Sequence, residues 1–201
     1  NPSTAITCVK PSGTVSQLVN SSSGIHPRFS PYYVRTVRAD NKDPLAKYMV
    51  EAGFPVEDAL GFDGKPAGNG QLVFSFPVES PEGAVCVPEV GAIEQLELVK
   101  LYNEHWCEHK ASCTIYYRDS EFLAVAQWIW DNFNTVSGIS LLPRDDHIYM
   151  QAPYQPCSKS EYQTMLKGFP KLDMEEFSKF EVEDNTTSSQ ELACVGGACE
   201  I

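Results

Sequence analysis

The sequence predicts an α/β fold, because segments with the two-residue period of strands alternate along the chain with segments of helical period. The strand period is clearest at residues 72–79. One face of that segment carries Leu72, Phe74, Phe76 and Val78. The helical period is clearest at residues 91–107, and a content of 42% hydrophobic and 21% charged residues is typical of a globular protein.

The first half of the chain reads as short elements separated by turns. Residues 4–10 are predicted to form a buried strand, followed by a Pro-Ser-Gly-Thr turn and a helix towards Leu18. An extended segment follows from Tyr32 to Arg38. Residues 44–53 are predicted to form a short helix that Gly53 ends. Residues 61–70, with four glycines and a proline, must be a loop.

The second half contains two predicted amphipathic helices, each followed by a predicted strand, at residues 112–118 and 137–142. The apolar stripe of the first helix would consist of Ala92, Leu96, Val99, Tyr102 and Trp106. That of the second would consist of Phe122, Ala126, Ile129, Trp130 and Phe133. Residues 181–201 are polar and acidic with no periodic apolar face, so we expect a folded domain over residues 1–180 and a flexible tail after it.

The charge balance limits the possible partners. The net charge is −12, which argues against general binding to nucleic acid or to an anionic membrane. Residues 1–39 nevertheless contain Lys10 and three arginines but no Asp or Glu. An acid-free segment around a glycine turn suits a small anionic ligand, although chance segregation of charge is the simpler alternative.

The sequence also predicts the cellular compartment and whether the chain is part of a longer protein. Seven cysteines, an odd number, without a signal peptide favour a reducing compartment such as the cytoplasm over a disulfide scaffold. No run of 18 apolar residues is present, so no transmembrane helix is expected. The chain begins with Asn1-Pro2-Ser3 and almost at once continues into a strand-like run, which leads us to expect the C-terminal part of a longer protein.

Cys194 and Cys199 form a candidate redox-active pair near the end of the chain. Four residues separate them, and Gly196-Gly197 among these can adopt the positive φ values that a tight reversal needs. Two thiols on a flexible tether can exchange with a disulfide held in a confined pocket. The alternatives are two inert thiols or half of a zinc site, which would need four ligands. The tethered position favours the exchange role.

The segment Pro11, Ser12, Gly13, Thr14 and Val15 is a candidate phosphate-binding loop. If a helix begins at Thr14, the N–H groups of residues 13–15 point to a common position where an anion is favoured. The hydroxyls of Ser12 and Thr14 could add hydrogen bonds. The alternative, a helix N-terminus capped by Thr14 or Ser12 with no ligand, remains open at this point.

Two other groups of residues invite a chemical interpretation, but a structural one is favoured. His105, Cys107, His109 and Cys113 match no standard zinc spacing, so no metal site is predicted. Tyr116-Tyr117 alternate across a predicted strand, so one of them should face the core rather than serve a radical relay.

The order of several motifs is far more specific than any one of them. The motifs are "NPSTAITCVKPSGTVSQL", "SSSGIHPRFSPYYVRTVR", "ASCTIYY", "GISLLPRDDHIYMQAPYQP" and the terminal "ACVGGACEI". Together they resemble the C-terminal part of the adenosylcobalamin-dependent (class II) ribonucleotide reductases, of the monomeric ribonucleoside-triphosphate reductase type. The resemblance implies the last part of a ten-stranded α/β barrel followed by a flexible tail.

The resemblance also implies roles for residues. The loop matching Pro11–Val15 would bind the phosphates of a ribonucleoside triphosphate. The pair matching Cys194 and Cys199 would reduce the active-site disulfide formed in each turnover and be re-reduced by thioredoxin or a similar dithiol. Adenosylcobalamin would generate a thiyl radical on a cysteine that lies upstream in the family, in the missing N-terminal part, so the isolated chain is expected to be inactive.

One departure and two alternatives belong with the resemblance. Glu108-His109 stand where the family tends to have Asp-Asn, which puts any role of those positions in doubt. The first alternative is a dimetal-type ribonucleoside-diphosphate reductase large subunit. The second is a non-catalytic module that docks thioredoxin and completes a barrel in trans. A glycyl-radical reductase is disfavoured, because Gly196-Gly197 lie between cysteines.

Overall fold

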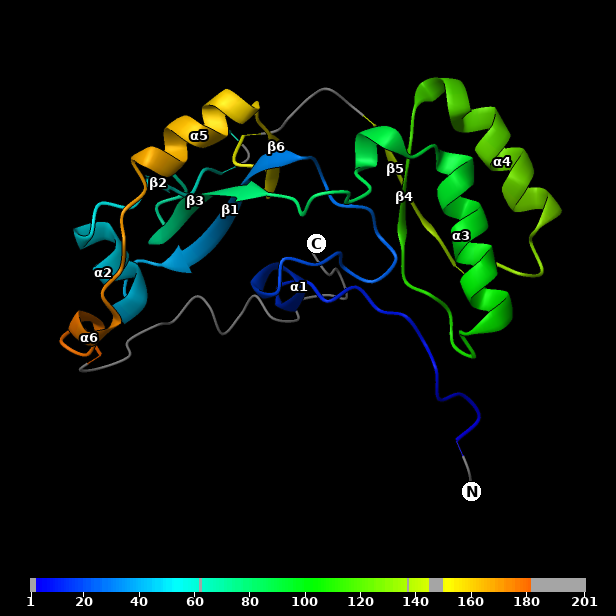
Figure 1. Ribbon diagram of the computed structural model, residues 1–201, viewed down its shortest axis with the longest axis horizontal. Helices are drawn as coiled ribbons and strands as arrows, with labels where there is room; N and C mark the ends of the chain where they lie inside the picture. Colours follow the sequence, from blue (N-terminus) through cyan, green and yellow to red (C-terminus); the bar gives the residue numbers. More distant parts are fainter. Residues whose placement is uncertain (1–2, 62, 137, 145–149, 182–201) are drawn as a thin grey trace. The chain divides into compact units, whose positions relative to one another are not determined.

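The computed structural model describes residues 3–61, 63–136, 138–144 and 150–181. Cys194, Cys199 and the rest of 182–201 therefore lie outside the described residues, as does Ser137 of the predicted strand 137–142. The chain divides into two compact units, unit 1 (residues 1–31 and 80–147) and unit 2 (residues 32–79 and 148–201), which are described separately (Figure 1).

Unit 2 is built on an antiparallel sheet of four strands in the order β2-β3-β1-β6. The strands are β1 (Tyr32–Asp40), β2 (Val56–Asp58), β3 (Gln71–Glu79) and β6 (Tyr154–Pro156). The two long strands β1 and β3 pair along their whole length, from Tyr32 opposite Glu79 to Asp40 opposite Gln71. Both were predicted from the sequence as extended segments, and the prediction is confirmed.

The described residues of unit 2 form three helices, α2 (Pro44–Glu51), α5 (Lys159–Lys167) and α6 (Met174–Phe177). Asp43 begins α2 by accepting hydrogen bonds from the amides of residues 45 and 46, and Gly53 follows its end with φ +81°. Helix α5 packs against β1 and β3 (Figure 1). The core of this unit consists of Ala46, Met49, Phe54 and Phe74, with Phe76 and Phe169 packed against them.

The described part of unit 1 contains the Pro11–Val15 loop, three helices and a pair of parallel strands. Its elements are α1 (Val15–Leu18), the 3-10 turns η1 (Val87–Glu89) and η2 (Asp119–Glu121), the helices α3 (Ala92–His105) and α4 (Phe122–Asp131), and the strands β4 (Thr114–Tyr117) and β5 (Ser140–Pro143). Strands β4 and β5 are parallel. Leu96, Val99, Ile115 and Val125 form the centre of the core.

The mixed α/β architecture is thus confirmed, and among the described strands β4 and β5 form the parallel pair. The described strands close no barrel. Among the helices in the described part of the chain, none combines the length and hydropathy that a membrane crossing requires.

Two details differ from the prediction. Residues 4–10 form no strand: they run extended beside residues 107–112 with only two backbone bonds, from His109 N to Thr7 O and from Ser112 N to Val9 O, and Ile6 is 80% exposed. In α4 the buried residues are Val125 and Trp128, whereas Trp130 is 79% exposed. Of the predicted stripe, Ile129 does pack against the core. Apolar residues cover most of this helix and only Gln127 and Asp131 mark a polar side, so the period alone left more than one candidate for the buried face.

Candidate functional site

The Pro11–Val15 loop lies on the surface of unit 1. Gly13 has φ +60°, a left-handed conformation that favours glycine, and residues 12–15 are exposed. The backbone N–H groups of Gly13 and Thr14 donate to no acceptor among the described residues. The loop therefore presents unpaired donors to solvent, as an anion site requires.

The helix that follows the loop is shorter than the sequence suggested. It begins at Val15 and has four residues, and the side chain of Thr14 makes no capping hydrogen bond. A helix of one turn has few aligned peptide dipoles, so any attraction of an anion must come mainly from the amides and hydroxyls of the loop. Thr14 is not the cap that one alternative proposed.

Ser12 holds the loop to its surroundings at both its hydroxyl and its amide. Its Oγ accepts a hydrogen bond from Ser16 N at 3.2 Å, which is the capping role that the sequence left open for this residue. Its backbone N–H donates to Ser23 Oγ at 2.9 Å. The Ser12 amide is thus already satisfied and points away from a ligand.

Gly24 brings the next motif against the start of the loop. It has φ +58°, and a Cβ placed on it would lie 2.9 Å from Lys10 O and 3.4 Å from Pro11 N. Contacts that short to backbone atoms do not occur without displacement, so only glycine allows residues 22–26 to pack this closely against residues 10–12.

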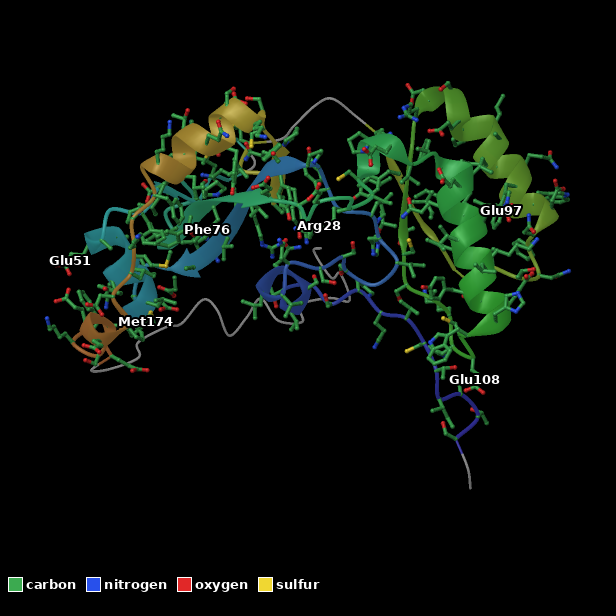
Figure 2. The ribbon with its side chains drawn as sticks, in the orientation of Figure 1. Arg28, Glu51, Phe76, Glu97, Glu108 and Met174 are labelled. Carbon is green, nitrogen blue, oxygen red and sulfur yellow. The ribbon has the colours of Figure 1, made fainter. Side chains whose placement is uncertain are left out.

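Arg28 holds the chain just after α1, at residues 20 and 21, by hydrogen bonds (Figure 2). Its side chain is 4% exposed. It donates to Ser21 O at 2.6 Å, to Asn20 Oδ1 at 2.8 Å and to Ser80 Oγ at 3.3 Å. Because Ser21 N donates in turn to Ser16 O at 2.8 Å, the exit from α1 is fixed by a buried guanidinium.

His26 connects the residues that support the Pro11–Val15 loop with β4. Its Nδ1 lies 2.8 Å from Ser23 O, and its Nε2 accepts from the amide of Thr114 at 2.9 Å. An amide N–H can only donate, so Nε2 carries the lone pair and the proton sits on Nδ1. Both ring nitrogens are occupied, which leaves His26 no free atom for a metal.

Ser16 is the one buried side chain of the described residues whose polar atom has no hydrogen-bond partner. The residue is 4% exposed, and its backbone N and O are both bonded. An unpaired buried hydroxyl costs about 1–3 kcal/mol. Nothing in the sequence marks this position, since a serine in the first turn of a helix is common.

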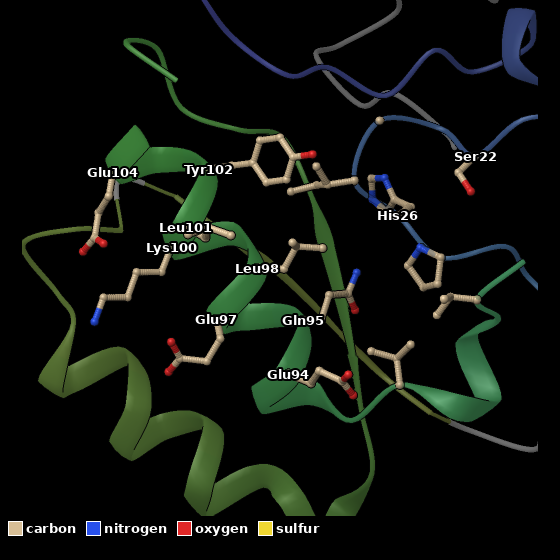
Figure 3. Close-up of a pocket in the computed structure, with 15 residues that line it drawn as sticks. Ser22, His26, Glu94, Gln95, Glu97, Leu98, Lys100, Leu101, Tyr102 and Glu104 are labelled. Carbon is tan, nitrogen blue, oxygen red and sulfur yellow. The ribbon is translucent and has the colours of Figure 1, made fainter. Parts of the chain in front are cut away.

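A pocket of about 920 Å³ lies between residues 22–27, residues 85–90 and α3 (Figure 3). Gln95, Leu98 and Tyr102 of α3 point towards it. No residue of the Pro11–Val15 loop lines it. Two of its polar side chains are already hydrogen-bonded, since Gln95 Nε2 donates to Cys113 Sγ and Thr114 O and Glu97 accepts from Trp128 Nε1. The carboxylates that line it, Glu94, Glu97 and Glu104, outnumber its one lining lysine, Lys100, and would repel a phosphate. The exposed loop, rather than this pocket, is therefore the better candidate for binding phosphates.

The His-Cys group of residues 105–113 does not form a cluster of ligands. Within the described part of the chain no three His, Cys, Asp or Glu side chains come together as a metal site would require. Cys113 is buried, and burial raises the pKa of its thiol to about 11, an effect that the hydrogen bond from Gln95 only partly offsets. Cys113 is thus an inert thiol near neutral pH.

Glu108, at the position that departs from the resemblance, has a structural partner instead. Its carboxylate accepts from the amides of Ile6 at 2.7 Å and Thr7 at 3.3 Å (Figure 2). These backbone hydrogen bonds hold the pKa of the Glu108 carboxyl below its usual value. In the tyrosine pair, Tyr117 packs against the core and lies 5.9 Å from the ring of Phe122, so the expectation that one tyrosine faces the core is confirmed.

The structure thus adds Ser16, Ser23, Gly24, His26 and Arg28 to the residues that the sequence assigned to the loop. Four of them belong to the "SSSGIHPRFS" stretch, which was useful only as part of a resemblance. A glycine after a run of serines, four residues before an arginine in an acid-free segment, was the available signal. The long-range contacts that give these residues a role cannot be read from sequence.

Comparison with known proteins gives the following relatives. The chain is 29% identical over 208 residues to the adenosylcobalamin-dependent ribonucleoside-triphosphate reductase of Lactobacillus delbrueckii, covering all of this chain and 27% of that protein. It is 26% identical over 199 residues to a probable adenosylcobalamin-dependent ribonucleoside-triphosphate reductase of Dictyostelium discoideum, covering 97% of this chain and 25% of that protein. No family model matches.

The fold agrees with the sequence comparison. The crystal structure of a B12-dependent (class II) ribonucleotide reductase superposes with a TM-score of 0.72 at 26% identity, covering 88% of this chain and 24% of that one. The chain spans about a quarter of the length of the curated relatives it matches. Sequence and structure thus confirm the resemblance that the motifs predicted: over nearly its whole length the chain is similar to a segment of the adenosylcobalamin-dependent ribonucleoside-triphosphate reductases.

Proposed function

We propose that this chain is the C-terminal part of an enzyme that reduces ribonucleoside triphosphates to 2′-deoxyribonucleoside triphosphates. The observation that carries the proposal is similarity along nearly all of the chain to reductases named for this reaction and for adenosylcobalamin. In the complete enzyme, residues 1–180 would supply the last part of the barrel, and the exposed strand β5 beside β4 would be covered there. The odd cysteine count fits work in a reducing cytoplasm.

In this proposal the Pro11–Val15 loop binds the substrate's phosphates. The unpaired amides of Gly13 and Thr14 and the exposed hydroxyl of Thr14 would donate to phosphate oxygens. The absence of acidic residues from 1–39 keeps repulsive carboxylates out of this segment. Gly13 allows the backbone to approach an anion closely, since it adds no side chain at a left-handed position.

Cys194 and Cys199 would act as the dithiol that carries reducing equivalents to the active site. Reduction of an active-site disulfide requires a thiolate attack, a mixed disulfide and resolution by the second thiol, which leaves the tail pair oxidised. Thioredoxin or a similar dithiol would then re-reduce the pair. The sequence supports this role through the Gly196-Gly197 spacer.

The cofactor is assigned to the complete enzyme rather than to particular residues of this chain. Adenosylcobalamin, when bound, supplies the radical that begins ribonucleotide reduction. The described residues contain no set that we assign to the corrin. The relatives' names support this class over the dimetal diphosphate reductase, and no observation favours an independent thioredoxin-docking module.

The tail and the loop can be tested separately in the complete enzyme. Cys194→Ser should abolish turnover driven by thioredoxin while a small dithiol that reaches the active site still supports it, and Cys8→Ser, at an exposed cysteine outside the pair, is the control. Loss with both reductants would refute the shuttle role.

For the loop, Thr14→Val should raise the KM for triphosphate, and an unchanged KM would refute its contact with phosphate.

A further inference from the structure

Ser23 and Gly24, for which the proposed function has no task, are in contact with the start of the phosphate loop. Ser23 Oγ accepts the Ser12 amide at 2.9 Å, and Gly24 lies against the backbone of Lys10 and Pro11. These contacts fix the two residues that immediately precede Gly13 and Thr14. The direction in which the unpaired amides point is therefore set by residues 23 and 24 together with the contact of Ser12 with Ser16 of the four-residue helix α1.

Ser23 is itself held in place by His26. The carbonyl of Ser23 accepts from His26 N at 3.1 Å and from Nδ1 at 2.8 Å, and Nε2 of the same ring accepts the Thr114 amide. A series of hydrogen bonds thus runs from β4 through His26 and Ser23 to Ser12, and from Ser12 Oγ to Ser16 N. The amide N–H groups in this series can only donate, so the atoms bonded to them accept. Each acceptor takes one hydrogen bond, apart from the Ser23 carbonyl, which accepts two.

We propose that Ser23 is a positioning residue for phosphate binding, and that His26 holds Ser23 in register with β4. Ser23 touches no substrate atom in this proposal. Its hydroxyl accepts the hydrogen bond of the Ser12 amide, so that this amide does not face the ligand. The next two amides, those of Gly13 and Thr14, are left directed outwards. The inference rests on the proposed phosphate-binding role of the loop and adds the residues that make the loop competent before substrate arrives.

The first test measures binding of inorganic tripolyphosphate to the complete enzyme by calorimetry, which removes the base and ribose from consideration. Ser23→Ala should weaken binding about tenfold, because a single hydrogen bond that orders a loop is worth roughly that factor. Ser23→Thr keeps the hydroxyl and should bind within about twofold of wild type. Ser22→Ala, the same change at an exposed neighbour, is the matched control and should change nothing.

Kinetics separate positioning from general damage. For Ser23→Ala the KM for ribonucleoside triphosphate should rise about tenfold while kcat at saturation stays within about twofold, since substrate in excess restores the bound loop. A fall in kcat with unchanged KM, or equal effects of Ser23→Ala and Ser22→Ala, would overturn the assignment.

His26 offers a second test, because two substitutions each keep one of its hydrogen bonds. Asn places an N–H donor near the position of Nδ1 and can still bind Ser23 O, whereas Gln places an acceptor near Nε2 and can still bind the Thr114 amide. We expect His26→Asn to keep tripolyphosphate affinity closer to wild type than His26→Gln does, and the reverse order would contradict a route through Ser23. If wild-type enzyme reduces triphosphates but binds no tripolyphosphate, both this inference and the phosphate role of the loop fail. If the wild-type enzyme binds tripolyphosphate and the Ser23 and His26 variants bind it equally well, this inference fails while the phosphate role of the loop stands.

Discussion

The hydroxyl of Ser23 accepts the backbone amide of Ser12 at a distance of 2.9 Å, across eleven residues of chain. This contact places the "SSSGIHPRFS" stretch beside the "PSGT" turn, two motifs that the sequence shows only as successive segments.

Gly24→Ala should lower the free energy of unfolding of unit 1 by about 2–3 kcal/mol, since the change adds a left-handed alanine and a Cβ only 2.9 Å from Lys10 O. The control is Gly83→Ala, which has φ +74° with nothing within 4 Å of the added Cβ, and should cost only about 1 kcal/mol. Denaturant unfolding followed by tryptophan fluorescence measures the difference, because Trp106, Trp128 and Trp130 all lie in unit 1. Equal losses would show that the contact with Lys10 does not matter.

Ser16→Ala should leave the stability of unit 1 unchanged or raise it by about 1 kcal/mol, because it removes a buried hydroxyl that has no partner. Most substitutions at buried positions have the opposite sign. The same fluorescence assay applies. A loss above about 1 kcal/mol would mean that the hydroxyl is hydrogen-bonded in solution.

Tyr48→Phe should loosen the segment around Asp173 in unit 2. The Tyr48 hydroxyl donates to Asp173 O at 2.7 Å and accepts from Asp173 N at 3.0 Å, while its ring contacts with Phe177 and Phe180 would survive the change. Loss of about 1 kcal/mol of local stability corresponds to roughly fivefold faster trypsin cleavage after Lys171 and Lys179. Tyr102→Phe, in unit 1, is the control, and equal acceleration by both variants would contradict the role of the Tyr48 hydroxyl.

Cys113 should react far more slowly with iodoacetamide than the exposed Cys8. With a pKa of about 11, about one Cys113 thiol in a thousand is ionised at pH 8, and this fraction rises about tenfold at pH 9. The folded pKa lies above the ordinary value of 9, so the associated stability is present below pH 9 and is lost as the pH rises from 9 towards 11. Peptide mapping of the labelled protein measures both rates. Equal labelling of the two cysteines at pH 8 would contradict the burial of Cys113.

The sequence predicted the long elements well and the environment of the short ones poorly. Strand β3 was predicted correctly because Phe74 and its neighbours alternate, and α3 because Leu96 and Val99 recur with helical period. Helix α4 was predicted correctly as a helix, but of its predicted stripe Ile129 packs against the core while Trp130 is exposed, since most of the helix surface is apolar and its period allows more than one buried face. Its exposed Trp130 and the exposed strand β5 fit a chain that spans a quarter of its relatives' length.

The candidate site was predictable in its loop and not in its supports. Pro11–Val15 stood out because glycine, proline and hydroxyl residues mark a turn with free donors. Ser23 and Arg28 did not, because their roles depend on hydrogen bonds to residues 12, 20 and 21 that exist only once the chain has folded. The short α1 also removed most of the helix dipole that the sequence suggested.

The most direct test of the account is reduction of a ribonucleoside triphosphate by this chain joined to the upstream remainder that its relatives possess, assayed with and without adenosylcobalamin. We expect 2′-deoxyribonucleoside triphosphate to form only when adenosylcobalamin is present. Product formed without adenosylcobalamin but with a metal-loaded partner subunit would contradict it and assign the chain to the dimetal class.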